Sequence, residues 1–135
     1  MSINLKNNLP ESAKYALIIN GDETPTDYHI QYEDINGSLT NTGNNNDNNI
    51  LSLDAGQTGF VKLTISKDIN SYIRAILQGS KGTGADIHNL NQTITTTNTV
   101  SDITSIGIKS LKSSDNSSIP AMSVGSEFVL TGSIK

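Results

Sequence analysis

Apolar side chains recur at every second position along most of this chain. In residues 27–34, DYHIQYED, the apolar or aromatic side chains of Tyr28, Ile30 and Tyr32 share one parity, and polar residues occupy the other. The segment 59–67, GFVKLTISK, alternates in the same way. A period of two is the geometry of an extended strand, whose successive side chains point to opposite faces. The pattern therefore predicts an all-β chain whose strands each have one buried face.

Turn-forming residues separate these strands at intervals of about ten residues, as in small β domains. Asn36–Gly37, for example, is a favoured pair for a tight hairpin. The predicted strands lie at 14–20, 27–34, 37–42, 49–53, 59–67, 69–78, 86–100, 103–111 and 127–134. About eight or nine antiparallel strands in a single domain over residues 1–135 favour a β-sandwich, with a flattened β-barrel as the alternative.

The segment 69–78, INSYIRAILQ, fits two patterns. Its apolar residues match helical spacing, but they also alternate as in a strand. β-Branched residues dominate and the neighbouring segments are strands, so we expect a strand here.

Composition excludes several classes of function. The 135 residues contain no cysteine, which excludes disulfides, zinc ribbons and thiol nucleophiles. The net charge is −4 and Arg74 is the single arginine, so dense contacts to nucleic acid are not expected. The amino terminus has no signal-peptide pattern, and no window is apolar enough to span a membrane. We expect a cytoplasmic protein, or one exported without a cleavable signal.

An asparagine-rich segment at 43–49, GNNNDNN, is the first candidate site. Alternating oxygen ligands at Asn45, Asp47 and Asn49 are how calcium loops begin. The closing glutamate of an EF-hand is missing, however, and a single carboxylate supplies little charge. A slack linker between two strands is therefore the favoured interpretation, and calcium is the one cofactor that the sequence suggests.

Two further loops carry candidate ligand-binding residues. The turn at 22–27 contains Asp22 and Asp27, which also fit a solvated hairpin turn. The segment 79–86, GSKGTGAD, has the glycines of a phosphate cradle and a cation at Lys81, but it matches neither G-x-x-x-x-G-K-[ST] nor G-x-G-x-x-G. We expect a flexible hairpin loop here.

Two residues next to the glycine segment offer acid–base chemistry. His88 lies two positions after Asp86, so in a strand both side chains point to one face. An imidazole oriented by a carboxylate is the usual general base, although exposed polar pairs of this kind are common. This pair is the basis of an alternative enzymatic function.

Aromatic residues are scarce and tryptophan is absent. Tyr28 and Tyr32 share a strand face and offer one stacking platform for a sugar, with a role in the core as the alternative. The favoured function is a non-enzymatic β-sandwich binding or assembly module. It would recognise a protein partner or a carbohydrate through its loops, or form homo-oligomers through its edge strands. The alternatives are a hydrolase or lyase using His88 and Asp86, and a toxin or secretion-system component acting at membranes.

Overall fold

The computed structural model describes residues 1–44, 46–84, 86–122 and 127–129. The strands are β1 (Ser2–Lys6), β2 (Ala13–Ile19), β3 (Tyr28–Asn36), β4 (Ser38–Asn44), β5 (Asn49–Leu53), β6 (Thr58–Lys67), β7 (Ile73–Thr83), β8 (Asp86–Thr96), β9 (Ile106–Lys112) and β10 (Glu127–Val129), and the 3-10 turn η1 (Pro25–Asp27) precedes β3. The chain is thus built almost entirely from strands, as its alternating pattern predicts.

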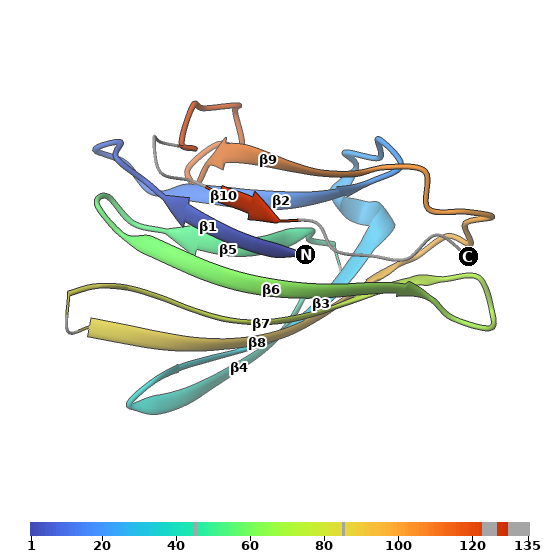
Figure 1. Cartoon of the computed structure of the whole chain (residues 1–135), viewed down its shortest axis with the longest axis horizontal. Helices are drawn as coiled ribbons and strands as arrows, with labels where there is room; N and C mark the ends of the chain where they lie inside the picture. The colour runs from blue at the N-terminus through green and yellow to red at the C-terminus, as the bar shows by residue number, and fades with distance from the viewer. Residues whose placement is uncertain (45, 85, 123–126, 130–135) are drawn as a thin grey trace.

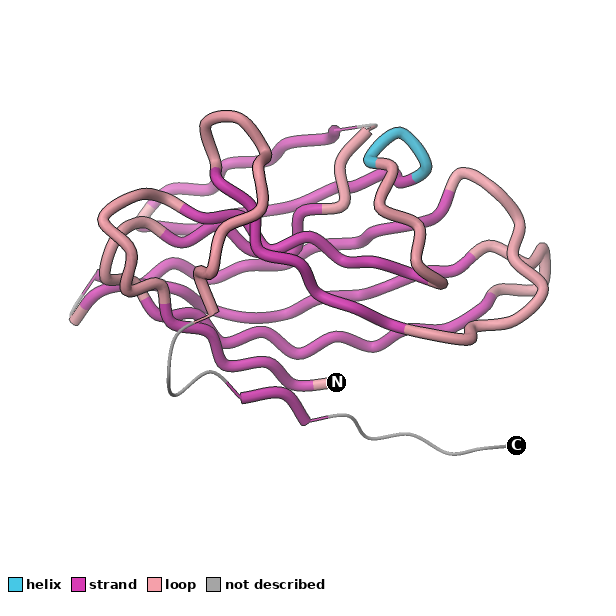
Figure 2. Tube along the Cα trace, turned by 90° about the horizontal axis from the view of Figure 1, so that it is seen from above, coloured by secondary structure: helices cyan, strands magenta, loops and turns pink. Residues whose placement is uncertain are grey.

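The strands form two antiparallel sheets. The larger sheet has the strand order β10-β1-β6-β7-β8-β3-β4, and the smaller sheet has the order β5-β2-β9. In Figure 1 strands β9 and β2 of the smaller sheet lie above β6, β7 and β8 of the larger sheet, and Figure 2 shows the strands from above. The predicted β-sandwich is confirmed, and the alternative of a flattened barrel is wrong because the sheets do not close on each other.

Some predicted boundaries differ from the structure. The segment 69–78 is a strand, but only from Ile73, because the Asp68 carboxylate accepts hydrogen bonds from the backbone N–H groups of Asn70 and Tyr72 and holds a turn there. Strand β1 had no predicted counterpart, since its run of alternating apolar residues is only five residues long. Of the predicted strand 127–134, β10 covers 127–129, and the rest lies outside the described residues.

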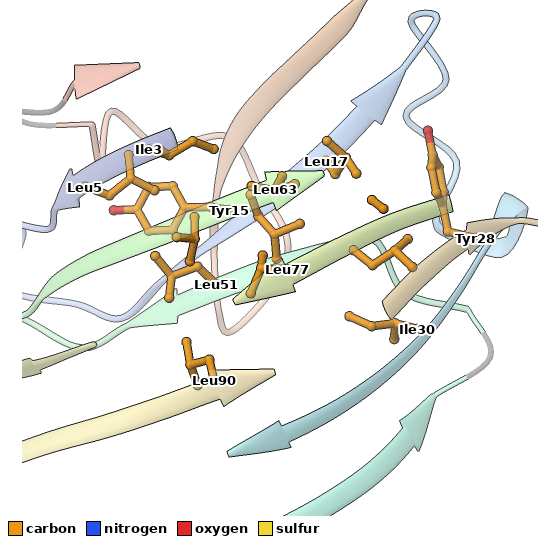
Figure 3. Close-up of a cluster of buried hydrophobic side chains, with 14 of the residues drawn as sticks. Ile3, Leu5, Tyr15, Leu17, Tyr28, Ile30, Leu51, Leu63, Leu77 and Leu90 are labelled. Atoms are coloured by element: carbon orange, nitrogen blue, oxygen red, sulfur yellow. The ribbon is translucent and has the colours of Figure 1, made fainter. Parts of the chain in front are cut away.

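The core lies between the sheets and is formed by the inward-facing apolar side chains (Figure 3). Two tyrosines within it have hydrogen-bond partners. The hydroxyl of Tyr15 donates to the carbonyl of Ala121 at 2.8 Å. The hydroxyl of Tyr28 donates to the carbonyl of Asp22 at 2.8 Å and accepts from the Ile19 N–H at 3.0 Å. A buried hydroxyl is tolerated because its hydrogen bonds are satisfied.

The flexible hairpin loop predicted over 79–86 is wrong for residues 79–83, because β7 continues to Thr83, and Asp86 already begins β8. The glycines are explained by close backbone approach within the sheet. A Cβ at Gly79 would lie 2.3 Å from the carbonyl oxygen of Phe60, and a Cβ at Gly82 would lie 1.9 Å from that of Asp86. Glycine therefore lets β7 pass tightly between β6 and β8, and this sets the backbone on which Lys81 and His88 are held.

Candidate functional site

Along β3, β7 and β8, the inward-facing side chains of the larger sheet are apolar at one end and include charged residues at the other. Leu77 is buried under the smaller sheet, whereas Lys81, four residues further along the same face of β7, is a partly buried cation. At this end the face forms one wall of a groove with a volume of about 310 Å³. That wall consists of Ile30, Tyr32, Asp34, Lys81, Leu90 and Gln92. The opposite wall consists of Lys14, Asp47, Asn49, Leu51 and Ser52. We call this feature the inner groove.

An ionic cluster lies on the larger-sheet wall. The His88 Nδ1 atom is 2.8 Å from Asp34 Oδ1, and the Lys81 Nζ atom is 3.7 Å from Asp34 Oδ2. Strand pairing explains the arrangement, because Lys81 is opposite His88 across β7 and β8, and Asp34 is on the adjacent strand β3. All three side chains are partly buried, so the attraction between the Lys81 ammonium and the Asp34 carboxylate is screened less than on an open surface.

The Asp86 carboxylate is at the edge of this cluster. Its Oδ2 atom lies 4.0 Å from His88 Nε2, and the Asp86 side chain is largely exposed. The predicted pairing of His88 with Asp86 on one strand face is therefore present, but Asp34 is the carboxylate that orients the imidazole. Sequence reasoning did not identify Asp34, because the two residues are far apart in the chain.

Gln92 contributes an unsatisfied acceptor. Its side chain is only 9% exposed, and its Oε1 atom is the one buried side-chain polar atom of the described residues that has no hydrogen-bond partner. A buried acceptor without a donor is destabilising by about 1–3 kcal/mol. Such atoms are rare in folded proteins and indicate water, a ligand or a functional strain. Gln92 is paired with Tyr32 across β8 and β3, in the middle of the groove wall.

The two tyrosines that were predicted to form a stacking platform lie in different surroundings. Tyr28 is 1% exposed and belongs to the core, and its burial raises the pKa of its hydroxyl. Tyr32 is only partly buried and lines the inner groove. The stacking hypothesis is therefore wrong for Tyr28, while the position of Tyr32 is compatible with it.

The asparagine-rich segment carries the chain from one sheet to the other. Asn48 is buried, and it binds Leu17 twice, through its Nδ2 atom to the Leu17 carbonyl and through its own carbonyl to the Leu17 N–H. Asp47 Oδ1 accepts from the Asn49 N–H, and Asn49 Oδ1 accepts from the Leu51 N–H. The interpretation as slack chain is thus wrong for residues 47–49, because these hydrogen bonds hold them as part of the groove wall.

Calcium at this segment stays a prediction. Asn45 lies outside the described residues. Asp47 Oδ1 and Asn49 Oδ1 already accept backbone hydrogen bonds. Among the residues that the structure describes, no three histidine or acidic side chains are grouped so as to hold a metal ion.

The acidic turn at 22–27 lies at the other end of β3. The Asp27 backbone carbonyl accepts from the Thr97 N–H, next to the strand pair Tyr28–Thr96. At the opposite end of β3, Ile35 pairs with Asn89, the residue after His88. The Asp22 carboxylate accepts from the Thr24 N–H at 2.9 Å within the turn. The structure therefore brings together Lys81, Asp86 and His88, and it separates Asp22 and Asp27 from them.

A sequence signal for the groove residues exists. Asp34 continues the parity of the stripe Tyr28, Ile30 and Tyr32, and Lys81 and His88 likewise continue apolar stripes. An ionisable residue at an inward position at the end of a stripe indicates that the cover ends there. That signal identifies the residues one strand at a time, and only the strand register brings them together.

Comparison with known proteins gives no match to a family model, to a curated protein or to a solved structure. Within the described part of the chain, no helix has the length and apolar character needed to cross a membrane.

Proposed function

We propose that this chain is a non-enzymatic binding module that recognises a carbohydrate in the inner groove. The observation that carries the proposal is the polar set on an otherwise apolar sheet face, with the unsatisfied Oε1 atom of Gln92 within it. A ligand hydroxyl is a donor that can approach this region if the glutamine side chain turns toward the groove. Concave sites with a few convergent polar groups are the usual form of a ligand pocket.

The chemistry of the walls favours a neutral ligand rich in hydroxyl groups. Lys14 and Lys81 offset Asp34 and Asp47, so the groove presents no strong net charge. Carboxylates accept hydrogen bonds, ammonium groups donate them, and amides do both, which matches hydroxyl groups that act as donor and acceptor. The ring of Tyr32 adds an apolar surface for the C–H face of a sugar. The volume of about 310 Å³ suits a short saccharide, since ligand pockets begin at roughly 300 Å³.

A glycan array followed by titration calorimetry tests this function. We expect a short neutral saccharide to bind, and Tyr32→Ala and Asp34→Asn each to weaken its binding by about tenfold or more, as expected for the loss of roughly 1.4 kcal/mol. Glu33→Gln is the matched control, because Glu33 lies between these residues on β3 and is exposed on the opposite face. Unchanged affinity in both groove variants would refute the groove as the site.

One observation favours a hydrolase or lyase as a second candidate. A carboxylate that orients an imidazole is the arrangement of a general base, and His88 with Asp34 has it at 2.8 Å. In this alternative Asp34 takes the orienting role first assigned to Asp86. Incubation with the saccharides that bind, followed by chromatography, separates the two functions. His29, the other histidine of the chain, is exposed on the opposite face of β3 and supplies the control. Product formation that His88→Ala abolishes and His29→Ala preserves would establish catalysis, while binding without product supports the module.

A further inference from the structure

The tripeptide Ile-Asn-Gly occurs twice in this chain, at residues 19–21 and 35–37. An asparagine followed by glycine readily loses its side-chain ammonia. The reason is that glycine has no side chain to hinder the attack of its own backbone nitrogen on the neighbouring carboxamide. Isoleucine precedes the pair in both copies, so a difference in reactivity must come from the next residue or from the fold.

Both copies lie in exposed turns between antiparallel segments. Asn20–Gly21 connects Ile19 and Asp22, which form an isolated bridge, and Asn36–Gly37 lies at the turn of the hairpin that joins β3 to β4. Both asparagines and both glycines are exposed. Both glycines also have a positive φ, of 77° and 69° in chain order. Neither exposure to water nor the glycine conformation separates the two sites.

The carboxamide of Asn20 is held by four hydrogen bonds. Its Oδ1 atom accepts from the Thr104 N–H at 2.7 Å, from the Thr104 hydroxyl at 3.0 Å and from the Ser105 N–H at 3.1 Å. Its Nδ2 atom donates to the Asp102 carbonyl at 2.7 Å. These bonds fix the carboxamide against residues 102–105. It must leave that segment before its Cγ atom can turn to meet the Gly21 nitrogen.

Asn36 has no comparable restraint. It is the last residue of β3, and among the contacts of the residues that the structure describes, none is a hydrogen bond to its side chain. Gly37 follows in open space, since a Cβ there would meet no atom within 4 Å. The Asn36 carboxamide can therefore rotate toward the Gly37 nitrogen without giving up a described hydrogen bond.

We propose that Asn36 is a site of spontaneous chemical modification and that the fold protects Asn20 from the same reaction. The Gly37 nitrogen forms a bond to Asn36 Cγ, the bond from Cγ to Nδ2 breaks, and ammonia leaves with the proton of the Gly37 N–H. The product is a cyclic imide. Water then adds to one of its two carbonyl carbons and opens the ring, which leaves aspartate or isoaspartate at position 36.

The new carboxylate would lie on the groove side of β3. Position 36 has the same parity as Asp34 and is about 7 Å further along the strand. Ile35 pairs with Asn89, so the next step of this register brings position 36 toward His88. The ionic cluster then gains a negative charge at its end. Isoaspartate also adds a methylene to the backbone, which disturbs the register of β3 and β4. The reaction itself does not depend on the proposed function.

Peptide mass mapping tests the proposal on the native protein, aged at mildly alkaline pH in water that contains heavy oxygen. The label enters at residues that are hydrolysed during ageing, and fragment ions assign it to a position. We expect Asn36 to convert about tenfold or more faster than Asn20, since freeing the Asn20 carboxamide breaks several hydrogen bonds at once.

The same chain unfolded in guanidinium chloride is the matched control. The two Ile-Asn-Gly sequences then differ only in their surroundings along the chain, so Asn20 and Asn36 should convert at similar rates. Asn36→Gln is a second control, because the longer side chain closes the imide ring far more slowly and the label at position 36 should disappear. Equal conversion of Asn20 and Asn36 in the native protein overturns the proposal, as does a native protein in which Asn36 stays unmodified.

Discussion

The two halves of one sheet face differ in what covers them. Under the smaller sheet, β3 and β7 contribute Tyr28 and Leu77 to the core, and both side chains are almost fully buried. Four residues further along each strand, on the same face, Tyr32 and Lys81 line the inner groove. The strand geometry is the same in both halves. The difference teaches that alternation specifies which way a side chain points, while the facing layer decides whether that position belongs to a core or to a site.

The two halves also differ in their contribution to stability. The covered half removes large apolar side chains from water, at roughly 1.5–3 kcal/mol each. The open half holds partly buried ion pairs, whose attraction is offset by desolvation and side-chain ordering. We therefore expect folding to depend on the covered half and binding on the open half.

The largest expected difference is between two alanine substitutions on β7. Leu77→Ala should lower the free energy of unfolding by about 2–5 kcal/mol, because it leaves a cavity in the core. Lys81→Ala should lower it by less than about 1 kcal/mol, since Asp34 keeps its contact with His88. Urea denaturation of both variants measures the difference. Equal losses would show that the open half is as important for folding as the covered half.

A substitution at the junction of the halves should have the next largest effect. Gly79 lies between Leu77 and Lys81, and Gly79→Ala forces the new Cβ against the Phe60 backbone. We expect a loss of about 1–3 kcal/mol, as for other overpacked sites. Gly43→Ala is the control, because a Cβ there meets no atom within 4 Å. Similar denaturation midpoints for the two variants would contradict the close approach of β6 and β7.

Removing single hydroxyl groups sharpens the comparison between the two tyrosines of β3. Tyr28→Phe leaves the Ile19 N–H and the Asp22 carbonyl without this partner in the buried region, and should lower stability by about 1–2 kcal/mol. Tyr32→Phe should change stability by no more than about 0.5 kcal/mol, because Tyr32 is only partly buried. Thermal melts of both variants test the prediction, and a larger effect at Tyr32 would reverse our assignment of core and site.

The covered half should also make the free energy of unfolding depend on pH in the alkaline range. Burial raises the pKa of Tyr15 to about 12, above the ordinary tyrosine value of 10.0, because the charged form is poorly solvated there. The unfolded chain then loses its proton first, so the stability present below pH 10 should be lost as the pH rises toward about 12. Tyr15→Phe should make this decline shallower in denaturation series from neutral to alkaline pH. An unchanged slope would show that other groups control alkaline unfolding.

Much of the fold could be predicted from local pattern. The parity of residues 27–34 and 59–67 identified β3 and β6 and their buried faces, and the Asn36–Gly37 pair identified the hairpin that joins β3 to β4. Segment 79–86 was misjudged, because glycine is permissive in loops and equally necessary where backbones approach closely. The ionic cluster escaped prediction for a different reason, since Asp34 and His88 are 54 residues apart.

The sequence by itself determined the β class, the inward parity of strands such as β3 and β6, and the placement of charged residues at the ends of apolar stripes. These are local properties, set by backbone geometry and by the cost of burying charge. Only the tertiary structure decided that Asp34, Lys81 and His88 meet, that Asp22 and Asp27 lie elsewhere, and that β4 is an edge. Strand order and register depend on the packing of the whole chain, and a local pattern carries no information about which distant strand will be the neighbour.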